Sequence, residues 1–239
     1  ILTYLPQDLD SMIGEVALED DFHLASTGMI TVEGLPTNEL IAMKKDIEEK
    51  LTGLRREIEE MASVFLYDDT IQTRLEGVGI LSMNDAMDLG CVGPMARASG
   101  VPNDYRMADD DGAYRDLGFH PVLEQAGDCL ARAKVRIGEL YQSIDIILGA
   151  LQNLPEGAIA APVRGVPPKG EFFTRVEQPR GEAIYYVKGN GTKNLERFRL
   201  RTPTNCNIAA LVKMLQGCDL ADVPNIILTI DPCISCCER

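Results

Sequence analysis

The sequence has no apolar run long enough to cross a membrane, and it is poor in basic residues. No stretch reaches the roughly 18 to 20 apolar residues that a transmembrane helix needs, and the first residues lack the pattern of an export signal. Lys and Arg number 23 against 37 Asp and Glu, a formal net charge of −14. Such a field repels phosphate groups. We therefore expect no nucleic-acid partner and no direct membrane insertion.

Histidine is scarce, and the cysteines do not suit disulfide pairing. The chain has two histidines and seven cysteines, an odd number at irregular spacing. This excludes the usual disulfide framework of a small secreted protein and favours a reducing, cytoplasmic compartment. We expect His23 and His120 at the surface or in loops rather than as metal ligands. The chain begins at Ile1 without an initiator methionine, so we expect it to be processed or truncated.

Two long segments have apolar residues at alternating intervals of three and four, which is typical of helices that pack along one side. In the first, which starts at Thr37, these residues are Leu40, Met43, Ile47, Leu51, Leu54, Ile58, Met61 and Phe65. In the second, which starts after Pro121, they are Leu123, Ala126, Leu130, Ala133, Ile137, Leu140, Ile144, Ile147 and Leu151. Helices of about 30 residues span roughly 45 Å, so we expect the two to lie alongside each other in a bundle.

Shorter elements fill the rest of the chain. Between the two long helices, glycines and prolines predict a long ordered loop, in which Ser82 can cap one short helix. After Pro155, aromatic and β-branched residues predict three strands, at 172–176, 183–187 and 197–201. A short helix around Ile208 follows, whereas 226–230 fits either a helix or a strand.

Together these patterns predict a mainly α fold, a long-helix bundle with a small antiparallel β-hairpin or sheet inserted, of the α+β class. We divide the chain into four parts by their composition. These are an irregular amino-terminal segment (1–36), a helical bundle core (37–155), a linker with a small β subdomain (156–206), and a carboxyl-terminal helix with a metal-ligand tail (207–239).

The tail contains one Cys-x-x-Cys pair, Cys233 and Cys236. Two thiolates at this spacing in a turn can hold one metal ion. A structural zinc ion needs four ligands, which Cys206 and Cys218 would complete. A thioredoxin-like redox pair would instead begin a helix, yet three residues follow Cys236. The residues alone leave these alternatives open, and we expect the cysteines outside the tail to be buried and chemically inert, namely Cys91, Cys129, Cys206 and Cys218.

Residues 231–239 resemble the carboxyl-terminal signature of the large subunit of nickel-iron hydrogenases, Asp-Pro-Cys-x-x-Cys, two further residues and a terminal Arg or His. Other segments resemble the membrane-bound, energy-converting hydrogenases and the related quinone-site, 49 kDa-type subunit of respiratory complex I. These segments are 74–80, 93–100, 175–182 and 201–205. The complex I relatives lack the nickel cysteines, so Cys233 and Cys236 favour a hydrogenase.

The resemblance implies a nickel-iron centre whose iron carries carbon monoxide and cyanide, Ni-Fe(CO)(CN)2. Cys233 would be a terminal nickel ligand and Cys236 a thiolate that bridges nickel to iron, and such soft ligands suit these metals. Cys233 would also serve as the base that takes a proton from H2. Cys237 matches no ligand position.

The resemblance also implies the surroundings of that centre. Arg180 and Asp231 would form a catalytic pair over the metals, with Arg180 in an electrostatic and positioning role because a guanidinium is rarely neutral. Thr204 would donate a hydrogen bond to a cyanide. Pro203 would line the same pocket, and Pro179, directly before Arg180, would lie in the layer around the metal ligands.

The implied function is reversible H2 oxidation and proton reduction, with ferredoxin-type electron transfer in a membrane-associated complex. No iron-sulfur motif occurs in the sequence, so a separate small subunit would carry that cluster. Further membrane and soluble subunits would hold the chain at the cytoplasmic membrane without inserting it. Two alternatives remain, a complex I-like quinone-site or structural subunit without hydrogenase activity and a small zinc-binding protein.

The sequence departs from the hydrogenase pattern in two respects. The family draws two further cysteines from an Arg-x-Cys-x-x-Cys motif, which does not occur here, and Cys91 and Cys129 lack that spacing. We therefore expect half of the ligand set, in a chain that lacks about the first third of a typical large subunit. Arg239 replaces the terminal histidine of many relatives, so we expect no additional divalent ion.

Overall fold

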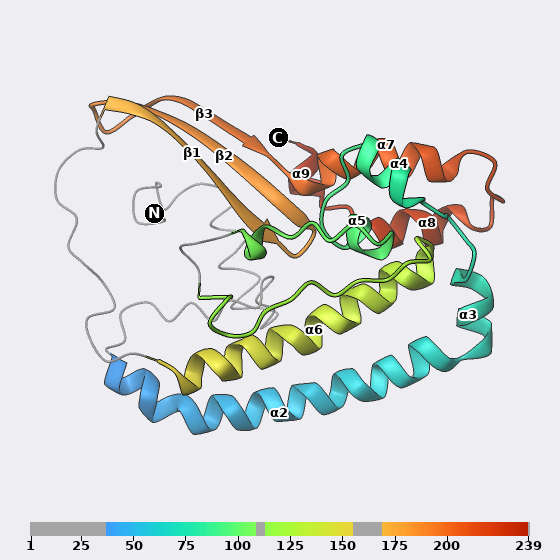
Figure 1. Cartoon of the computed structure of the whole chain (residues 1–239), viewed down its shortest axis with the longest axis horizontal. Coiled ribbons are helices and arrows are strands. Elements are labelled where there is room, and N and C mark those ends of the chain that lie inside the picture. The colour runs from blue at the N-terminus through green and yellow to red at the C-terminus, as the bar shows by residue number, and fades with distance from the viewer. Residues whose placement is uncertain (1–36, 109–112, 155–168, 239) are drawn as a thin grey trace. The chain divides into compact units, whose positions relative to one another are not determined.

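The structure is a computed structural model that describes residues 37–108, 113–154 and 169–238 (Figure 1). Helices predominate over one three-stranded antiparallel sheet, as the sequence predicts. Residues 36–239 group as one compact unit. The irregular segment 1–36 and most of the predicted linker lie outside the described residues. No helix in the described part is long and apolar enough to cross a membrane.

The two long helices are α2 (Thr37–Tyr67) and α6 (Cys129–Gln152), and they run side by side as predicted (Figure 1). Their contact is a short apolar seam in which Ile47, Leu51 and Ile58 of α2 meet Ile144 of α6. The opposite side of α2 is charged and exposed. Removal of this one stripe from water is the main stabilisation of the pair.

The predicted start of the second helix, after Pro121, is wrong. The helix begins at Cys129, and its N-cap is Asp128, whose carboxylate accepts a hydrogen bond of 2.7 Å from the Ala131 N–H. The preceding Gly127 has a φ of +66°, and a Cβ there would lie 2.1 Å from the Leu81 carbonyl oxygen. This close approach of two backbone segments stops the helix, although Pro121 suits a first helical turn.

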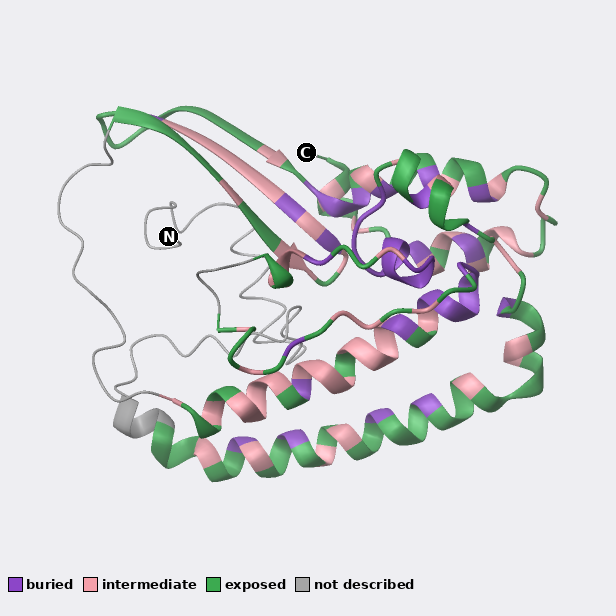
Figure 2. Ribbon diagram, viewed as in Figure 1, coloured by how far each residue is buried: buried purple, intermediate pink, exposed green. Residues whose placement is uncertain are grey.

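The described residues between α2 and α6 form the short helices α3 (Asp69–Leu75), α4 (Met83–Asp88) and α5 (Pro94–Ala98) and the 3₁₀ turn η2 (Tyr105–Met107). The predicted cap is confirmed, since Ser82 Oγ accepts from the Asp85 N–H at 3.1 Å. The sequence did not predict α3 and α5, which are too short to show periodicity. All five residues of α5 are buried, and Figure 2 shows this helix at the centre of the packed region.

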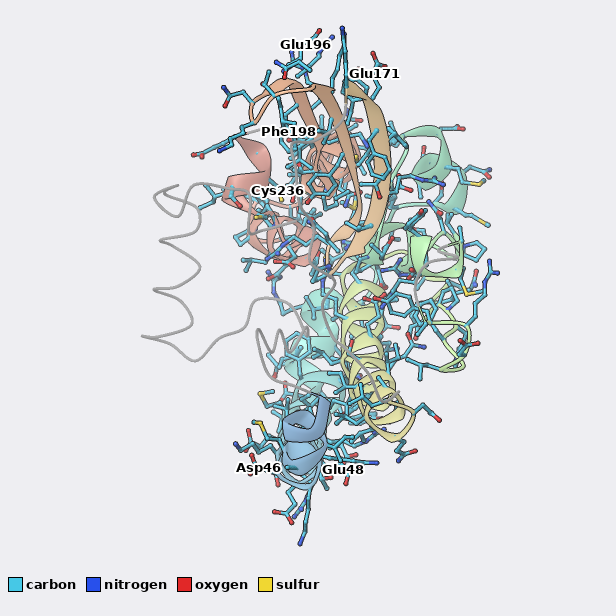
Figure 3. The ribbon with its side chains drawn as sticks, turned by 90° about the vertical axis from the view of Figure 1, so that its left-hand side faces the viewer. Asp46, Glu48, Glu171, Glu196, Phe198 and Cys236 are labelled. Carbon is cyan, nitrogen blue, oxygen red and sulfur yellow. The ribbon has the colours of Figure 1, made fainter. Side chains whose placement is uncertain are left out.

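The three predicted strands are confirmed and are longer than expected. They are β1 (Lys169–Gln178), β2 (Gly181–Asn190) and β3 (Leu195–Arg201), paired antiparallel in the order β1-β2-β3. At one end of the sheet Glu171 and Glu196 flank Lys188, with the Lys188–Glu196 ion pair at 2.7 Å (Figure 3). At the other end, Gln178 pairs with Gly181 across a turn of two residues.

Three helices end the described chain: α7 (Pro203–Leu215), α8 (Val223–Ile230) and α9 (Ile234–Cys237). The segment 226–230, which fitted a helix or a strand, is helical. Ile226 and Ile230 are buried one helical turn apart, whereas Leu228 between them is 71% exposed. The buried pair belongs to the largest core cluster, which joins residues of α3, α4, α5, α6, α7 and α8.

Replacement of Ile226 by alanine tests whether this cluster stabilises the fold. Ile226 is fully buried, so we expect Ile226→Ala to lower the free energy of unfolding by about 2–5 kcal/mol. Leu228→Ala, on the exposed side of the same helix, is the matched control and should change it little. Urea unfolding of the full chain measures both. Equal losses for the two variants would contradict this packing of α8.

Candidate functional site

Arg180 stands in the two-residue turn between β1 and β2, and it joins the sheet to the end of α8. Its Nε donates to the Asp231 carbonyl oxygen at 2.9 Å, and its Nη2 donates to Asp231 Oδ1 at 3.0 Å. Two hydrogen bonds to one residue fix the orientation of the planar guanidinium. The contact therefore holds the turn and the start of the carboxyl-terminal tail together.

Asp231 has an unusual backbone conformation. It follows α8 as the C-cap, with φ 54° and ψ 62°, and it is the one non-glycine residue with positive φ among those the structure describes. The left-handed region costs an L-residue about 1 kcal/mol. Here it reverses the chain after α8 and presents both the carbonyl and the carboxylate of Asp231 to Arg180.

The cysteine tail lies on the first turn of α7. The Cys233 N–H donates to Thr204 Oγ1 at 3.3 Å, and Thr202 Oγ1 donates to the Cys236 carbonyl at 2.7 Å. Thr204 is 2% exposed and also forms a side-chain hydrogen bond to Cys236. Two threonines thus fix the backbone of the tail on both sides of the Cys-x-x-Cys turn.

The two thiols of the pair have opposite pKa shifts. Burial, the largest influence on each, raises the pKa of a thiol. At Cys233 the hydrogen bonds from Ser235 and from the backbone and thiol of Cys236, with the charge of Arg180, outweigh burial and lower the pKa. At Cys236 burial and the neighbouring Cys233 sulfur raise the pKa. Cys233 is therefore the first of the pair to become a thiolate, the form that binds metals and accepts protons.

A close backbone contact with the residue before α5 supports the Arg180 turn. A Cβ on Gly93 would lie 2.3 Å from the Arg180 carbonyl oxygen, and one on Gly181 would lie 2.7 Å from the Gly93 nitrogen. The buried Asn207 side chain holds the adjoining segment, since it accepts from the Val92 N–H at 3.0 Å and donates to the Val92 carbonyl at 3.2 Å. The turn is therefore seated against α5 and α7 rather than free in solvent.

Two further arginines on α6 approach the same region. Arg132 is fully buried, and its Nε donates to Thr229 Oγ1 of α8 at 3.1 Å. Arg136 interacts electrostatically with both Asp231 and Arg180, and burial lowers its pKa to about 10. Positive charge thus faces Asp231 from the β1–β2 turn and from α6.

The structure brings most of the predicted site residues together. Arg180 and Asp231 form the expected ion pair, and Cys233 and Cys236 lie half-buried beside it. Pro203 and Thr204 are buried at the start of α7, whereas Pro179 is exposed in the turn. The catalytic and metal-binding roles of these residues stay predictions.

The described residues do not assemble a zinc site. Across 37–108, 113–154 and 169–238, no three His, Cys, Asp or Glu side chains are grouped to hold a metal ion. The set Cys206, Cys218, Cys233 and Cys236 is therefore not gathered. Cys91 and Cys129 are buried as expected, whereas Cys206 and Cys218 are only half-buried; burial raises the pKa of Cys91 to about 11. Cys129, however, accepts a hydrogen bond from Arg132 at 3.2 Å and so does more than fill space.

The polar residues that support this region were not predicted from the sequence. Arg132, Arg136 and Glu139 recur at intervals of four and three on α6, so they form a second, polar seam beside the predicted apolar one. That spacing is visible in the sequence. The role of Asn207 is not, because its partner Val92 lies 115 residues away.

Comparison with known proteins assigns a family to this arrangement. Residues 25–167 and 163–239 match the family described as "Respiratory-chain NADH dehydrogenase, 49 Kd subunit". The membrane-bound hydrogenase subunit alpha of Pyrococcus furiosus is 36% identical over 227 residues, 88% of this chain and 53% of the relative. The carbon monoxide-induced hydrogenase of Rhodospirillum rubrum is 41% identical over 182 residues, 76% and 50% of the two chains.

Other relatives have no hydrogenase in their names. A subunit of the NADH-quinone oxidoreductase of Dehalococcoides mccartyi is 37% identical, and the match covers 84% of this chain and 54% of the relative. A chain of the membrane-bound sulfane sulfur reductase, an archaeal respiratory membrane complex, has a similar structure, with a TM-score of 0.77, 30% identity, and coverage of 82% and 55%. The chain spans about half the length of these relatives. It belongs to the 49 kDa subunit family of respiratory-chain NADH dehydrogenase, with a membrane-bound hydrogenase subunit and a carbon monoxide-induced hydrogenase among its relatives.

Proposed function

We propose that this chain is the carboxyl-terminal part of the large subunit of an energy-converting nickel-iron hydrogenase. The observation that carries the proposal is the Cys233–Cys236 pair, seated next to the Arg180–Asp231 ion pair. Its relatives include a membrane-bound hydrogenase and a carbon monoxide-induced hydrogenase, each matched over about half its length. The reaction is reversible H2 oxidation and proton reduction.

The residues present fit half of a nickel-iron centre. Two soft thiols lie in one turn, and the lowered pKa of Cys233 favours the thiolate that such metals bind. Cys233 and Cys236 would hold the metals through their thiolates. When bound, the Ni-Fe(CO)(CN)2 centre would polarise H2 and accept its electrons. The remaining two ligands would come from cysteines that this sequence does not contain.

The protein groups around the thiols would position and move a proton. Cys233 would take up the proton released from H2 at its sulfur, because its thiol is deprotonated before that of Cys236 and is then free to accept one. Arg180, fixed by its two hydrogen bonds to Asp231, would keep positive charge near the thiols. The Thr204 hydroxyl, already bonded to the Cys236 side chain, would hold that sulfur in place.

A second candidate function is a complex I-like quinone-site or structural subunit without hydrogenase activity. It is favoured by the family match and by the relatives that are subunits of NADH-quinone oxidoreductases. Under either function, the chain would work in a multi-subunit membrane complex. A small subunit with an iron-sulfur cluster would pass electrons to a ferredoxin-type carrier, and partner subunits would hold the chain at the cytoplasmic face of the membrane.

Substitution of the bridging cysteine separates the two functions. In the assembled complex, Cys236→Ser removes a soft ligand, so H2 uptake and evolution should fall to background while the complex stays intact. Cys237→Ser, the adjacent exposed cysteine, is the matched control and should keep full activity. Electron transfer that persists unchanged in Cys236→Ser would support the complex I-like function and refute the hydrogenase.

Conservative replacement of Arg180 tests its positioning role. Lysine keeps the charge but cannot make both hydrogen bonds to Asp231, so Arg180→Lys should lower kcat for H2 oxidation about 10²-fold. Nickel and iron contents should stay at the parent level, since Arg180 is not a ligand. Arg201→Lys, which changes a half-exposed arginine paired with Glu182, should leave kcat unchanged. Loss of the metals in Arg180→Lys would contradict a purely electrostatic role.

The separated 239-residue chain should bind metal weakly. Two thiols supply half of a four-cysteine site, so we expect less than stoichiometric nickel and no H2-dependent dye reduction from this chain alone. Equilibrium dialysis with nickel and a dye-reduction assay measure the two quantities. Stoichiometric nickel with H2-dependent dye reduction would overturn the expectation of a half site.

A further inference from the structure

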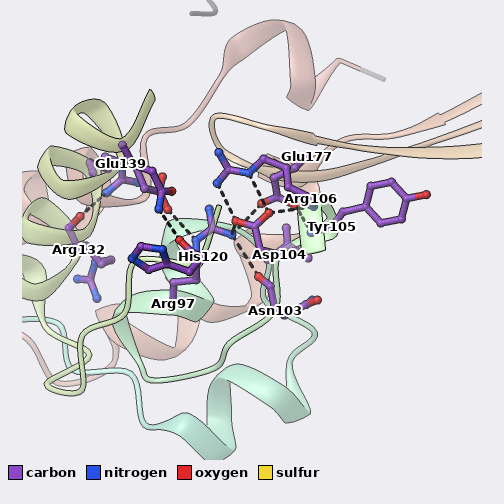
Figure 4. A network of polar contacts seen from close by, with 12 residues as sticks. Arg97, Asn103, Asp104, Tyr105, Arg106, His120, Arg132, Glu139 and Glu177 are labelled. Atoms are coloured by element: carbon purple, nitrogen blue, oxygen red, sulfur yellow. Dashed lines mark hydrogen bonds and ion pairs between the residues drawn. The ribbon is translucent and has the colours of Figure 1, made fainter. Parts of the chain in front are cut away.

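The three-stranded sheet is anchored to the helices at one end by buried ion pairs. The Arg97 cluster, which is Arg97 with Glu139, Glu177, Asp104 and Arg106, lies where β1 meets α5, α6 and η2 (Figure 4). Arg97 is 1% exposed, and its Nη1 donates to Glu177 Oε1 of β1 at 2.8 Å. The other carboxyl oxygen of Glu177 accepts from the backbone of η2 at 3.0 Å. This end of the sheet is held in a fixed position, which lowers the entropy lost when the sheet binds a partner.

Beyond this anchored end, both outer strands of the sheet are exposed. Figure 2 shows β1 and β3 largely exposed on either side of the half-buried β2. Because the strand order is β1-β2-β3, β3 pairs with β2 on one edge and with no described strand on the other. The edge of β1 is partly covered, since the Arg175 guanidinium carbon lies 4.6 Å from the centre of the Tyr105 ring. The open edge of β3 thus presents unpaired backbone N–H and C=O groups that can accept another strand.

One face of β3 is basic. Successive residues of a strand point to opposite faces of the sheet, so Arg197, Arg199 and Arg201 share one face. Residues 169–201 contain eight Lys and Arg against four Glu, although the whole chain has a formal net charge of −14. Arg201 pairs with Glu182 at 2.9 Å, whereas Arg197 and Arg199 form no ion pair with a described residue. This face therefore lacks carboxylates that a partner can supply.

The other face of β3 is apolar. Phe198 pairs with Val187 of β2, which pairs with Phe172 of β1, so the three side chains form one row across the sheet. Phe172 and Phe198 are 65% and 43% exposed. Leu200 and Val176 extend the same face along β3 and β1, because each lies an even number of residues from this row. Several exposed apolar side chains on one face are typical of a surface that binds another protein.

The placement of basic and apolar residues on opposite faces restricts the kind of partner. A second copy of this edge would bring like charges side by side, which disfavours pairing between copies. A membrane surface could contact the basic face or the apolar face but not both, and acyl chains cannot satisfy the backbone groups of the edge. An added strand contacts both faces at once, because its own side chains alternate between them. The features of β3 thus fit an extended segment of another protein.

We propose that the open edge of β3 binds an extended segment of a partner protein, in which acidic residues alternate with apolar ones. Over about seven residues, the length of β3, the segment forms backbone hydrogen bonds along the edge. Its carboxylates lie beside Arg197 and Arg199, and its apolar side chains cover Phe198 and Leu200. The inference holds for either candidate function, since both place the chain among partner subunits.

Amide hydrogen exchange tests whether a strand pairs with this edge. In the separated full chain, the amides of β3 that point away from β2 should exchange fast. In the assembled complex they should exchange at least about tenfold more slowly, because they donate to the partner strand. The amides of β2, which already lies between two strands, are the control and should change little. Exchange of β3 that is the same in the chain and in the complex overturns the proposal.

A photo-crosslink identifies the occupant of the edge. Benzoylphenylalanine in place of Phe198, in the assembled complex, should link to one segment of another subunit that has Asp or Glu at alternate positions. The same photoreactive residue in place of Leu220, which is 87% exposed between α7 and α8, is the control and should not link to that segment. A link to a second copy of this chain, to another part of the same chain, to lipid or to nothing overturns the proposal.

Reversal of charge on the basic face tests the chemistry of the partner. Arg197→Glu combined with Arg199→Glu should lower the crosslink yield at position 198 at least about tenfold, because like charges then meet. Arg56→Glu, which changes an exposed arginine of α2, is the matched control and should keep the parent yield. Lysines in place of the acidic residues of the linked segment should restore the yield in the double variant, which a misfolded sheet would not allow. A double variant with the parent yield, or one that the lysines fail to restore, overturns the proposal.

Discussion

The arrangement of the site depends on the hydrogen-bonded pair between Arg180 and Asp231. This contact joins the β1–β2 turn to the end of α8 across 51 residues of sequence, and the cysteine tail begins two residues later. The left-handed Asp231 and the close approach of Gly93 to Gly181 are both consequences of bringing these backbones together. The thiols are then placed by Thr202 and Thr204 at the start of α7, so several separate elements determine their position.

The helix α6 has two different roles on two sides. Its apolar residues pack against α2, which removes hydrocarbon from water in a region away from the thiols. Its polar seam, Arg132, Arg136 and Glu139, faces α8, Asp231 and the Arg97 cluster. Buried charges of this kind contribute little net stability, because desolvation offsets their attraction.

Periodicity and local chemistry predicted the elements whose causes are local. The helix α2 and the three strands follow from apolar spacing and aromatic content, and the Ser82 cap follows from one side chain. The predicted start of α6 was wrong because a tertiary contact, Gly127 against Leu81, overrides a suitable proline. The paired site residues were predicted from the resemblance of the tail to a known family. The ion pairs of Arg97 were not predicted, because its carboxylate partners lie between 7 and 80 residues away in the sequence.

The central question is whether Cys233 and Cys236 hold one side of a nickel-iron centre. Infrared spectroscopy and metal analysis of the assembled complex, produced with its maturation partners, decide it. We expect the stretching bands of iron-bound carbon monoxide and cyanide together with one nickel per complex, and the loss of both in the Cys236→Ser variant. A fully assembled complex with zinc or no metal at these cysteines, and without those bands, would contradict the proposed hydrogenase.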